Sequence, residues 1–125
     1  MGLIQGILGN ATQINPQECA AEIGGVLAQG EQVQLAFRVI RDLVVFTGGR
    51  MLIVDKQGIT GKRVEYTSIP YRAIVRFSVE TAGHFDVDSE LRIWVSGAAE
   101  PIRRPFSAGS PIVAVQQALA RYVCR

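Results

Sequence analysis

The segment Asp55 to Tyr66, DKQGITGKRVEY, places two glycines three residues apart directly before a Lys-Arg pair. Such a turn can hold a phosphate, because main-chain N–H groups and cationic side chains both attract oxyanions. A P-loop, however, needs a glycine where the chain has Lys56 and a Ser or Thr where it has Arg63. A KH-type clamp needs flanking helices, whereas the flanking residues are typical of strands. A plain turn between strands and an anion site with Lys56, Lys62 and Arg63 both remain as interpretations.

Metal-binding and catalytic patterns are sparse. Asp86, Asp88 and Glu90 alternate in DVDSE, but the glycine and the distal Glu of a calcium loop are missing. In an extended segment these acids share one face, which either meets water or faces Arg residues of a neighbouring chain. His84 stands alone, and the chain has no GxSxG or HExxH. We therefore predict no catalytic residue, no metal site and no cofactor, and expect a protein that is not an enzyme.

The composition indicates one folded unit. The chain has 125 residues, of which 48% are hydrophobic and 19% charged. The net charge is +2, and its eleven Arg and two Lys form no run longer than a pair, which argues against nucleic-acid binding. Cys19 and Cys124 lack metal or disulfide spacing, so we expect free thiols. MGLIQGILG carries no Lys or Arg, unlike a signal peptide, and we expect a cytoplasmic protein with at most peripheral membrane contact.

Helical patterns occupy the two ends of the chain. Asn15 can cap a helix that has Pro16 in its first turn and Gly30 as its stop. The apolar positions of residues 1–14 recur at helical spacing, but the glycines among them mean that this segment needs a packing partner. Near the C-terminus, Ser110 and Pro111 can begin a helix with one apolar face.

Between these helices the pattern changes to short alternating runs, which predicts seven antiparallel strands. Gly48-Gly49 is a two-residue hairpin signal between the second strand and the third. The predicted strands are approximately Gln32 to Val39, Asp42 to Thr47, Arg50 to Asp55, Gly61 to Ser68, Ile74 to Glu80, Leu91 to Ser96 and Pro101 to Phe106.

Two of these strands, containing LVVF and MLIV, are apolar on both faces. One face of a small sheet can be buried inside the domain, and the other needs the N-terminal helices or a neighbouring subunit. We place Leu43, Val45, Met51 and Ile53 on one face and Val44, Phe46, Leu52 and Val54 on the other. In LRIWVS the core alternation puts Trp94 on the outer side, either as an interface anchor or shielded by the N-terminal segment.

Seven strands followed by one helix is the order of a pleckstrin-homology fold. The stretches RDLVVFT (41–47), LIVDKQGITGKRVEYTSIPY (52–71) and RFSVETAGHFDVDSELRIWVSG (76–97) resemble the bacterial pleckstrin-homology domain family, formerly a domain of unknown function. The likeness spans nearly the whole chain. It implies a mainly β (α+β) fold of two roughly orthogonal antiparallel sheets with a C-terminal capping helix in residues 31–125. It also implies an N-terminal helical extension in residues 1–30 and assembly into homo-oligomeric rings, while the family's role is open.

Eukaryotic pleckstrin-homology domains bind phosphoinositides through a basic signature around the first hairpin. The corresponding stretch here, FRVIRDLVVF, has only Arg38 and Arg41, so that motif does not carry over. Weak attraction of Arg38, Arg41, Lys56, Lys62 and Arg63 to an anionic surface stays open beside their interpretation as ordinary solvated cations.

Our leading hypothesis is a non-enzymatic, homo-oligomeric module whose ring docks a protein or peptide partner, for example at a strand edge. Its predicted interface residues are Trp94, Val44, Phe46, Leu52 and Val54. The alternative is a peripheral module that binds an anionic membrane surface, with Leu3, Ile4, Ile7 and Leu8 dipping into the interface beside basic loops. The lack of cations in that N-terminal segment counts against this alternative.

Overall fold

The structure is a computed structural model that describes residues 12–39, 41–81, 89–106 and 111–124. Its strands form two antiparallel sheets, one in the order β1-β2-β3-β4-β5 and the other in the order β6-β7-β8. The strands are β1 (Thr12–Ile14), β2 (Val33–Val39), β3 (Asp42–Thr47), β4 (Arg50–Gln57), β5 (Arg63–Pro70), β6 (Ile74–Thr81), β7 (Ser89–Val95) and β8 (Ile102–Phe106). The helices are α2 (Pro16–Ile23) and α3 (Ile112–Val123), with short 3₁₀ turns η1 (Gly24–Val26) and η2 (Tyr71–Ala73).

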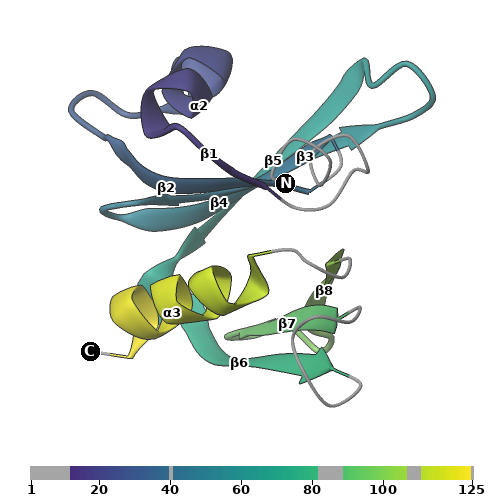
Figure 1. Cartoon of the computed structure of the whole chain (residues 1–125). Coiled ribbons are helices and arrows are strands. Elements are labelled where there is room, and N and C mark those ends of the chain that lie inside the picture. The colour runs from purple at the N-terminus through teal and green to yellow at the C-terminus, as the bar shows by residue number, and fades with distance from the viewer. Residues whose placement is uncertain (1–11, 40, 82–88, 107–110, 125) are drawn as a thin grey trace.

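Figure 1 shows how the helices lie on the sheets. Helix α2 covers the side of the larger sheet that faces away from the smaller one, and α3 lies next to the smaller sheet, on the side toward the larger. The predicted mainly β fold with two antiparallel sheets and a C-terminal helix is confirmed. Ser110, the predicted cap of that helix, lies outside the described residues.

The described part of the chain has eight strands, so the predicted number of seven is wrong. The additional strand is β1, whose Ile14 pairs with Ala36 of β2. Three residues are too few to produce a visible alternation, and only the neighbouring strand shows that this segment is extended. Residues 12–30 thus contribute a strand and a helix to the larger sheet, while the division into residues 1–30 and 31–125 stays a prediction.

Helix α2 begins as expected and ends early. Asn15 Oδ1 accepts hydrogen bonds from the main-chain N–H groups of Gln17 at 2.7 Å and Glu18 at 3.3 Å. The helix ends at Ile23, and the predicted end at Gly30 is wrong. Two consecutive glycines follow Ile23, and their low helix propensity favours the 3₁₀ turn found there.

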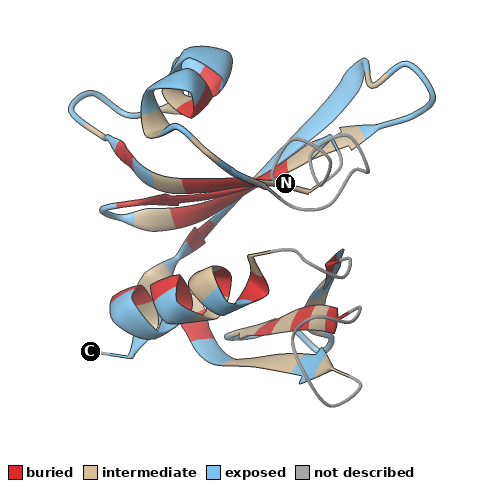
Figure 2. Cartoon of the chain, in the orientation of Figure 1, coloured by how far each residue is buried: buried red, intermediate tan, exposed pale blue. Residues whose placement is uncertain are grey.

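Apolar side chains form two separate cores on the two faces of the larger sheet. The inner core, between the sheets, is built from strands of both sheets and from α3, with Phe37, Phe46, Leu91, Ile93 and Leu119 among its buried members. The outer core, under α2, contains Cys19, Ile23, Val33, Ala36, Leu43, Val45, Leu52 and Val54. Figure 2 shows the resulting band of buried residues along β2, β3 and β4.

Strands β3 and β4 bury both faces, as predicted, but our grouping of residues across the two strands is wrong. Phe46 pairs with Met51 across the two-residue turn, so an even-numbered residue of β3 shares a face with an odd-numbered residue of β4. Val44 and Phe46 therefore lie in the inner core, whereas Leu52 and Val54 lie in the outer core.

The turn between β3 and β4 consists of Gly48 and Gly49, as the sequence predicts. Thr47 Oγ1 stabilises it by accepting hydrogen bonds from the main-chain N–H groups of Gly49 at 3.2 Å and Arg50 at 3.1 Å.

Within the described residues, no helix is both long enough and apolar enough to cross a membrane.

Candidate functional site

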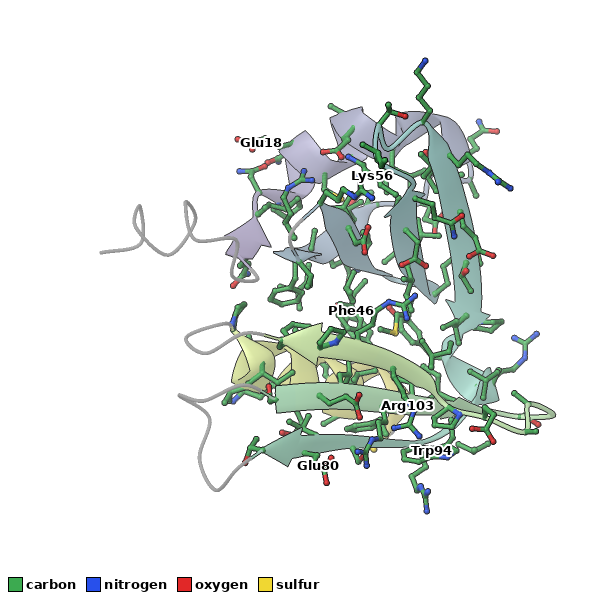
Figure 3. All side chains as sticks on the ribbon, turned by 90° about the vertical axis from the view of Figure 1, so that its right-hand side faces the viewer. Glu18, Phe46, Lys56, Glu80, Trp94 and Arg103 are labelled. Carbon is green, nitrogen blue, oxygen red and sulfur yellow. The ribbon has the colours of Figure 1, made fainter. Side chains whose placement is uncertain are left out.

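The five predicted cations lie on two neighbouring hairpins, β2–β3 and β4–β5, and two of them are paired with one acid. Arg38 of β2 donates a hydrogen bond of 2.6 Å to Glu22 Oε1, and Lys56 of β4 donates one of 3.0 Å to Glu22 Oε2. These contacts lower the pKa of the Glu22 carboxyl against the opposing effect of its burial. Figure 3 shows Lys56 on the α2 side of the sheet. Arg38 and Lys56 thus stabilise the packing of α2 on the larger sheet.

Arg41 holds the two hairpins together. Its Nη2 donates a hydrogen bond of 2.6 Å to the carbonyl oxygen of Gly58, in the loop between β4 and β5. Gly58 and Gly61 have φ angles of 78° and 69°, which other residues rarely adopt, and Gly61 N–H donates to Gly58 O at 3.3 Å. The GxxG spacing therefore serves a tight turn, and Arg41 fixes that turn against the neighbouring hairpin.

Lys62 and Arg63 are exposed and form no ion pair with any described residue. Beside them, at the tip of the loop, Ile59 is fully exposed, with a relative accessibility of 103%. Sequence reasoning missed Ile59, although an apolar residue between two turn glycines was visible in GITG. The structure therefore separates the five predicted cations into three with partners and two that follow the exposed Ile59 in the chain.

Strand β5 is an edge of the larger sheet. It pairs with β4 from Arg63 to Pro70, and within the described residues no strand pairs with its other side. Val64 and Tyr66 are 37% and 45% exposed. They pair with Lys56 and Val54 and so lie on the α2 side of the sheet, beyond the part that the helix covers.

Trp94 lies on the outer face of the smaller sheet, as the alternation of β7 predicts. Figure 3 shows it with Glu80 on the side of this sheet that points away from Phe46 and the inner core. The guanidinium of Arg76 stacks 3.8 Å from the centre of its ring. Val75, beside Arg76, is 66% exposed and lies where the pairing register of β6 shifts, between Ile74 and Arg76. Trp94, Arg76 and Val75 form what we call the Trp94 patch.

The other predicted interface residues lie inside the chain. Val44 and Phe46 are at most 2% exposed in the inner core, and Leu52 and Val54 are at most 1% exposed in the outer core. Helix α2 supplies the cover that the second apolar face requires. Among the five predicted interface residues, Trp94 is thus the one whose side chain has accessible surface.

A groove of about 780 Å³ lies between η1 and the Gly48-Gly49 turn. Arg50 donates two hydrogen bonds to Glu31 across it, at 2.8 and 2.9 Å, and a third of 2.7 Å to the carbonyl oxygen of Val26. Arg50 holds the pKa of the Glu31 carboxyl at about 2, below its usual value of 4.5. The two charges neutralise each other, so they tie η1 to the sheet and leave no free charge for a ligand.

The predicted absence of a metal site was based mainly on the segment DVDSE. Of its acids, Glu90 is described, and it accepts hydrogen bonds from Arg92 at 2.7 Å and Arg103 at 3.2 Å. Asp86, Asp88 and His84 lie outside the described residues. In the ranges that the structure describes, no three His, Cys, Asp or Glu side chains gather as metal ligands would.

Comparison with known proteins agrees with this fold. The profile of the family described as bacterial PH domain matches residues 2–123, nearly the full chain. The chain belongs to the bacterial PH domain family. The resemblance seen in its sequence is therefore confirmed. This bacterial PH domain is 51% identical over 121 residues to the uncharacterized protein YjqA of Bacillus subtilis (strain 168). The aligned region covers 96% of this chain and 97% of YjqA.

Two solved structures share this architecture at 47% identity. The crystal structure of a DUF1696 family protein with a pleckstrin-homology domain from Shewanella loihica PV-4 has a TM-score of 0.79, covering 92% of this chain and 98% of that one. The pleckstrin homology domain from Shewanella amazonensis SB2B has a TM-score of 0.81 and covers 98% of both chains. These likenesses confirm the predicted pleckstrin-homology-like fold of this bacterial PH domain.

Proposed function

We propose that this bacterial PH domain is a non-enzymatic, cytoplasmic and homo-oligomeric module that docks an extended segment of a partner protein. The observation that carries the proposal is the open edge of β5, eight residues long and paired on one side only within the described residues. An open strand edge presents unpaired N–H and C=O groups, which an extended peptide can satisfy by adding a further strand.

The side chains of β5 support a selective partner. Val64 and Tyr66 offer exposed apolar surface on one side of the strand, where a peptide's alternate side chains would lie. Arg63 and Glu65, also exposed, alternate with them. Charged residues on an edge discourage unspecific sheet pairing, so a partner has to match their charges as well as the main-chain hydrogen bonds.

The Trp94 patch is the surface that we assign to self-association. Trp and Arg are enriched at the centres of protein interfaces, and here Arg76 stacks on the ring of Trp94 beside the exposed Val75. The patch lies on the smaller sheet, whereas the β5 edge belongs to the larger one. An assembly through the patch would therefore keep the β5 edges open for partners.

Size-exclusion chromatography with light scattering tests the assembly. At micromolar concentration we expect a mass of several chains for the wild type and a lower mass for Trp94→Ala. The control is Val113→Ala, which removes exposed apolar surface from α3 and should keep the wild-type mass. A monomeric wild type would contradict the proposed assembly.

Selection from random peptides of about ten residues, enough to pair with the full length of β5, tests docking. Peptides selected on the wild type should lose binding to Val64→Lys/Tyr66→Lys, because two added cations and the loss of apolar contact weaken a neighbouring strand. Val113→Lys, which adds one cation at an exposed position of α3, is the control and should bind these peptides like the wild type. Equal binding to the double variant would exclude the β5 edge as the docking site.

A further inference from the structure

We propose that the tip of the β4–β5 hairpin docks on an anionic lipid bilayer, with Ile59 in the interfacial region and Lys62 and Arg63 at the headgroups. This goes beyond the docking of a protein partner at the β5 edge. It also assigns membrane contact to the hairpin, whereas the sequence suggested residues 1–14, of which 1–11 lie outside the described residues.

The first support is the exposure of Ile59. Most large apolar side chains in the described residues are buried or half-buried, and Ile59, at 103%, is the most exposed of those that are not. Val75, the next, reaches 66% within a strand. Figure 1 shows the β4–β5 hairpin projecting beyond the other connections of the larger sheet, so its tip can reach a flat surface before the rest of the domain does.

The second support is that the tip is held in place. The left-handed glycines Gly58 and Gly61 form the turn, and Arg41 donates a 2.6 Å hydrogen bond to the carbonyl oxygen of Gly58. A Cβ atom at Gly61 would lie 3.5 Å from Arg41 Nη1, so this guanidinium packs against the turn itself. A fixed turn presents Ile59 to a surface with little loss of conformational entropy on binding.

The third support is the charge around the tip. From Gly58 to Arg63 the chain has two cations and no acid. Neither Lys62 nor Arg63 is paired within the described residues. The nearest acid on β5, Glu65, lies further from the tip and receives a hydrogen bond from Gln57 at 3.5 Å. An exposed apolar residue with two unpaired cations shortly after it in the same hairpin is complementary to a bilayer that carries negative headgroups over an apolar interior.

The geometry favours a bilayer over a protein pocket. A stable protein interface buries about 800 Å² on each partner, and a projecting tip with one apolar side chain between glycines offers far less. A bilayer needs no complementary shape. A single apolar side chain can enter it, and each nearby cation adds its own attraction to the negative headgroups.

Vesicle sedimentation at low salt tests the proposal, with phosphatidylcholine vesicles and with vesicles of equimolar phosphatidylcholine and phosphatidylserine. We expect the wild type to bind the anionic vesicles and to dissociate as salt rises. Ile59→Ser should lower the partition coefficient roughly tenfold or more, because the buried apolar side chain is lost. Val113→Ser, the control at an exposed apolar position of α3, should bind like the wild type. Absence of wild-type binding, or equal binding by Ile59→Ser, overturns the proposal.

Charge reversal tests the cations. Lys62→Glu/Arg63→Glu should lower the partition coefficient at least about twentyfold, since each cation near an anionic surface contributes a factor of roughly five. Arg72→Glu/Arg121→Glu changes the net charge equally. Arg72 follows the far end of β5, roughly 25 Å from the tip and beyond the screening length, and Arg121 lies in α3. If both pairs of substitutions weaken binding equally, net charge accounts for the attraction and the tip is excluded.

Tryptophan fluorescence locates the contact. Trp94 is the only tryptophan of the chain, so Trp94→Phe provides a silent background. In that background the emission of Ile59→Trp should shift to shorter wavelength on anionic vesicles, and that of Val113→Trp, on α3, should not. An unshifted Ile59→Trp on vesicles that bind the protein would overturn the proposed insertion. All these substitutions are at exposed positions except Trp94→Phe, because Trp94 is half-buried. Urea unfolding checks that the Trp94→Phe protein is folded.

Discussion

Arg41, in the turn between β2 and β3, donates a 2.6 Å hydrogen bond to the carbonyl oxygen of Gly58, in the loop between β4 and β5. The two residues are 17 positions apart, and their contact joins the β2–β3 hairpin to the loop of the β4–β5 hairpin. The conformation of the β4–β5 tip therefore depends on the first hairpin as well as on its own glycines.

Arg41→Met should loosen the tip and leave the fold intact. The substitution keeps an apolar stem but removes the donor, and a hydrogen bond from a charged group contributes about 1.5–3 kcal/mol where it is formed. Hydrogen exchange of the Gly61 amide, which donates to Gly58, should accelerate roughly tenfold by NMR. The free energy of unfolding should change by less than about 1 kcal/mol, because the site is exposed. Arg63→Met is the control, and an unchanged Gly61 exchange rate would contradict the role of Arg41.

Glu31→Gln should reduce the sensitivity of the protein to acid. Because Arg50 lowers the pKa of Glu31 to about 2, the Glu31 carboxylate stabilises the folded state fully above its ordinary pKa of 4.5. This contribution is lost as the pH falls from about 4.5 to about 2. In urea unfolding across that range, the wild type should lose about 2 kcal/mol more than Glu31→Gln. Parallel pH profiles for the two proteins would show that the pair does not supply this stability.

The ion pair of Asp55 with Arg104 should couple the two sheets. Arg104 of β8 donates a 2.7 Å hydrogen bond to Asp55 of β4, and both side chains are at least three-quarters buried. Asp55→Ala leaves the guanidinium without its carboxylate and should cost about 1–3 kcal/mol of unfolding free energy.

Asp55→Leu/Arg104→Met should be more stable than the sum of its single substitutions predicts, because no buried charge is left unpaired. The coupling energy is obtained from urea unfolding of the wild type, Asp55→Leu, Arg104→Met and the double variant. Additive single effects would mean that the two residues stabilise the fold independently.

The two cysteines should differ in reactivity. Cys19 is fully buried in the outer core, and burial raises the pKa of its thiol to about 11, whereas Cys124 is exposed after α3. A disulfide reagent at pH 8 should therefore modify one thiol per folded chain rapidly and the second only at the rate of unfolding or local opening. Cys124→Ser should lack the rapid phase, and a rapid reaction of Cys19 would show that α2 detaches readily from the sheet.

Local sequence signals predict much of this fold. The alternation of β7, the apolar face of α3, the cap at Asn15 and the Gly48-Gly49 turn each depend on residues close together in the chain, and all four are found in the structure. Strand β1 was not predicted, and the end of α2 was predicted too late in the chain. A three-residue strand has too little pattern, and the two consecutive glycines after Ile23, which have low helix propensity, end the helix before the predicted stop at Gly30.

The candidate site was predicted only in part. The sequence identified the cations of the two hairpins, but only the folded chain shows that Glu22 pairs with Arg38 and Lys56 while Lys62 and Arg63 stay unpaired within the described residues. Ion pairs between residues 16 and 34 positions apart leave no periodic trace in a sequence.

The mainly β architecture and the turn character of the GITG loop follow from the sequence, because periodicity and glycine spacing act over a few residues, and the family follows from the resemblance of three longer stretches. Which apolar residues are covered and which are presented to water follows from the folded structure. Val44, Phe46, Leu52 and Val54 are covered by the chain's own elements, while Ile59 projects from a turn held by Arg41. Burial is a property of the packed whole, since it depends on elements that are far apart in the chain and meet only when it folds.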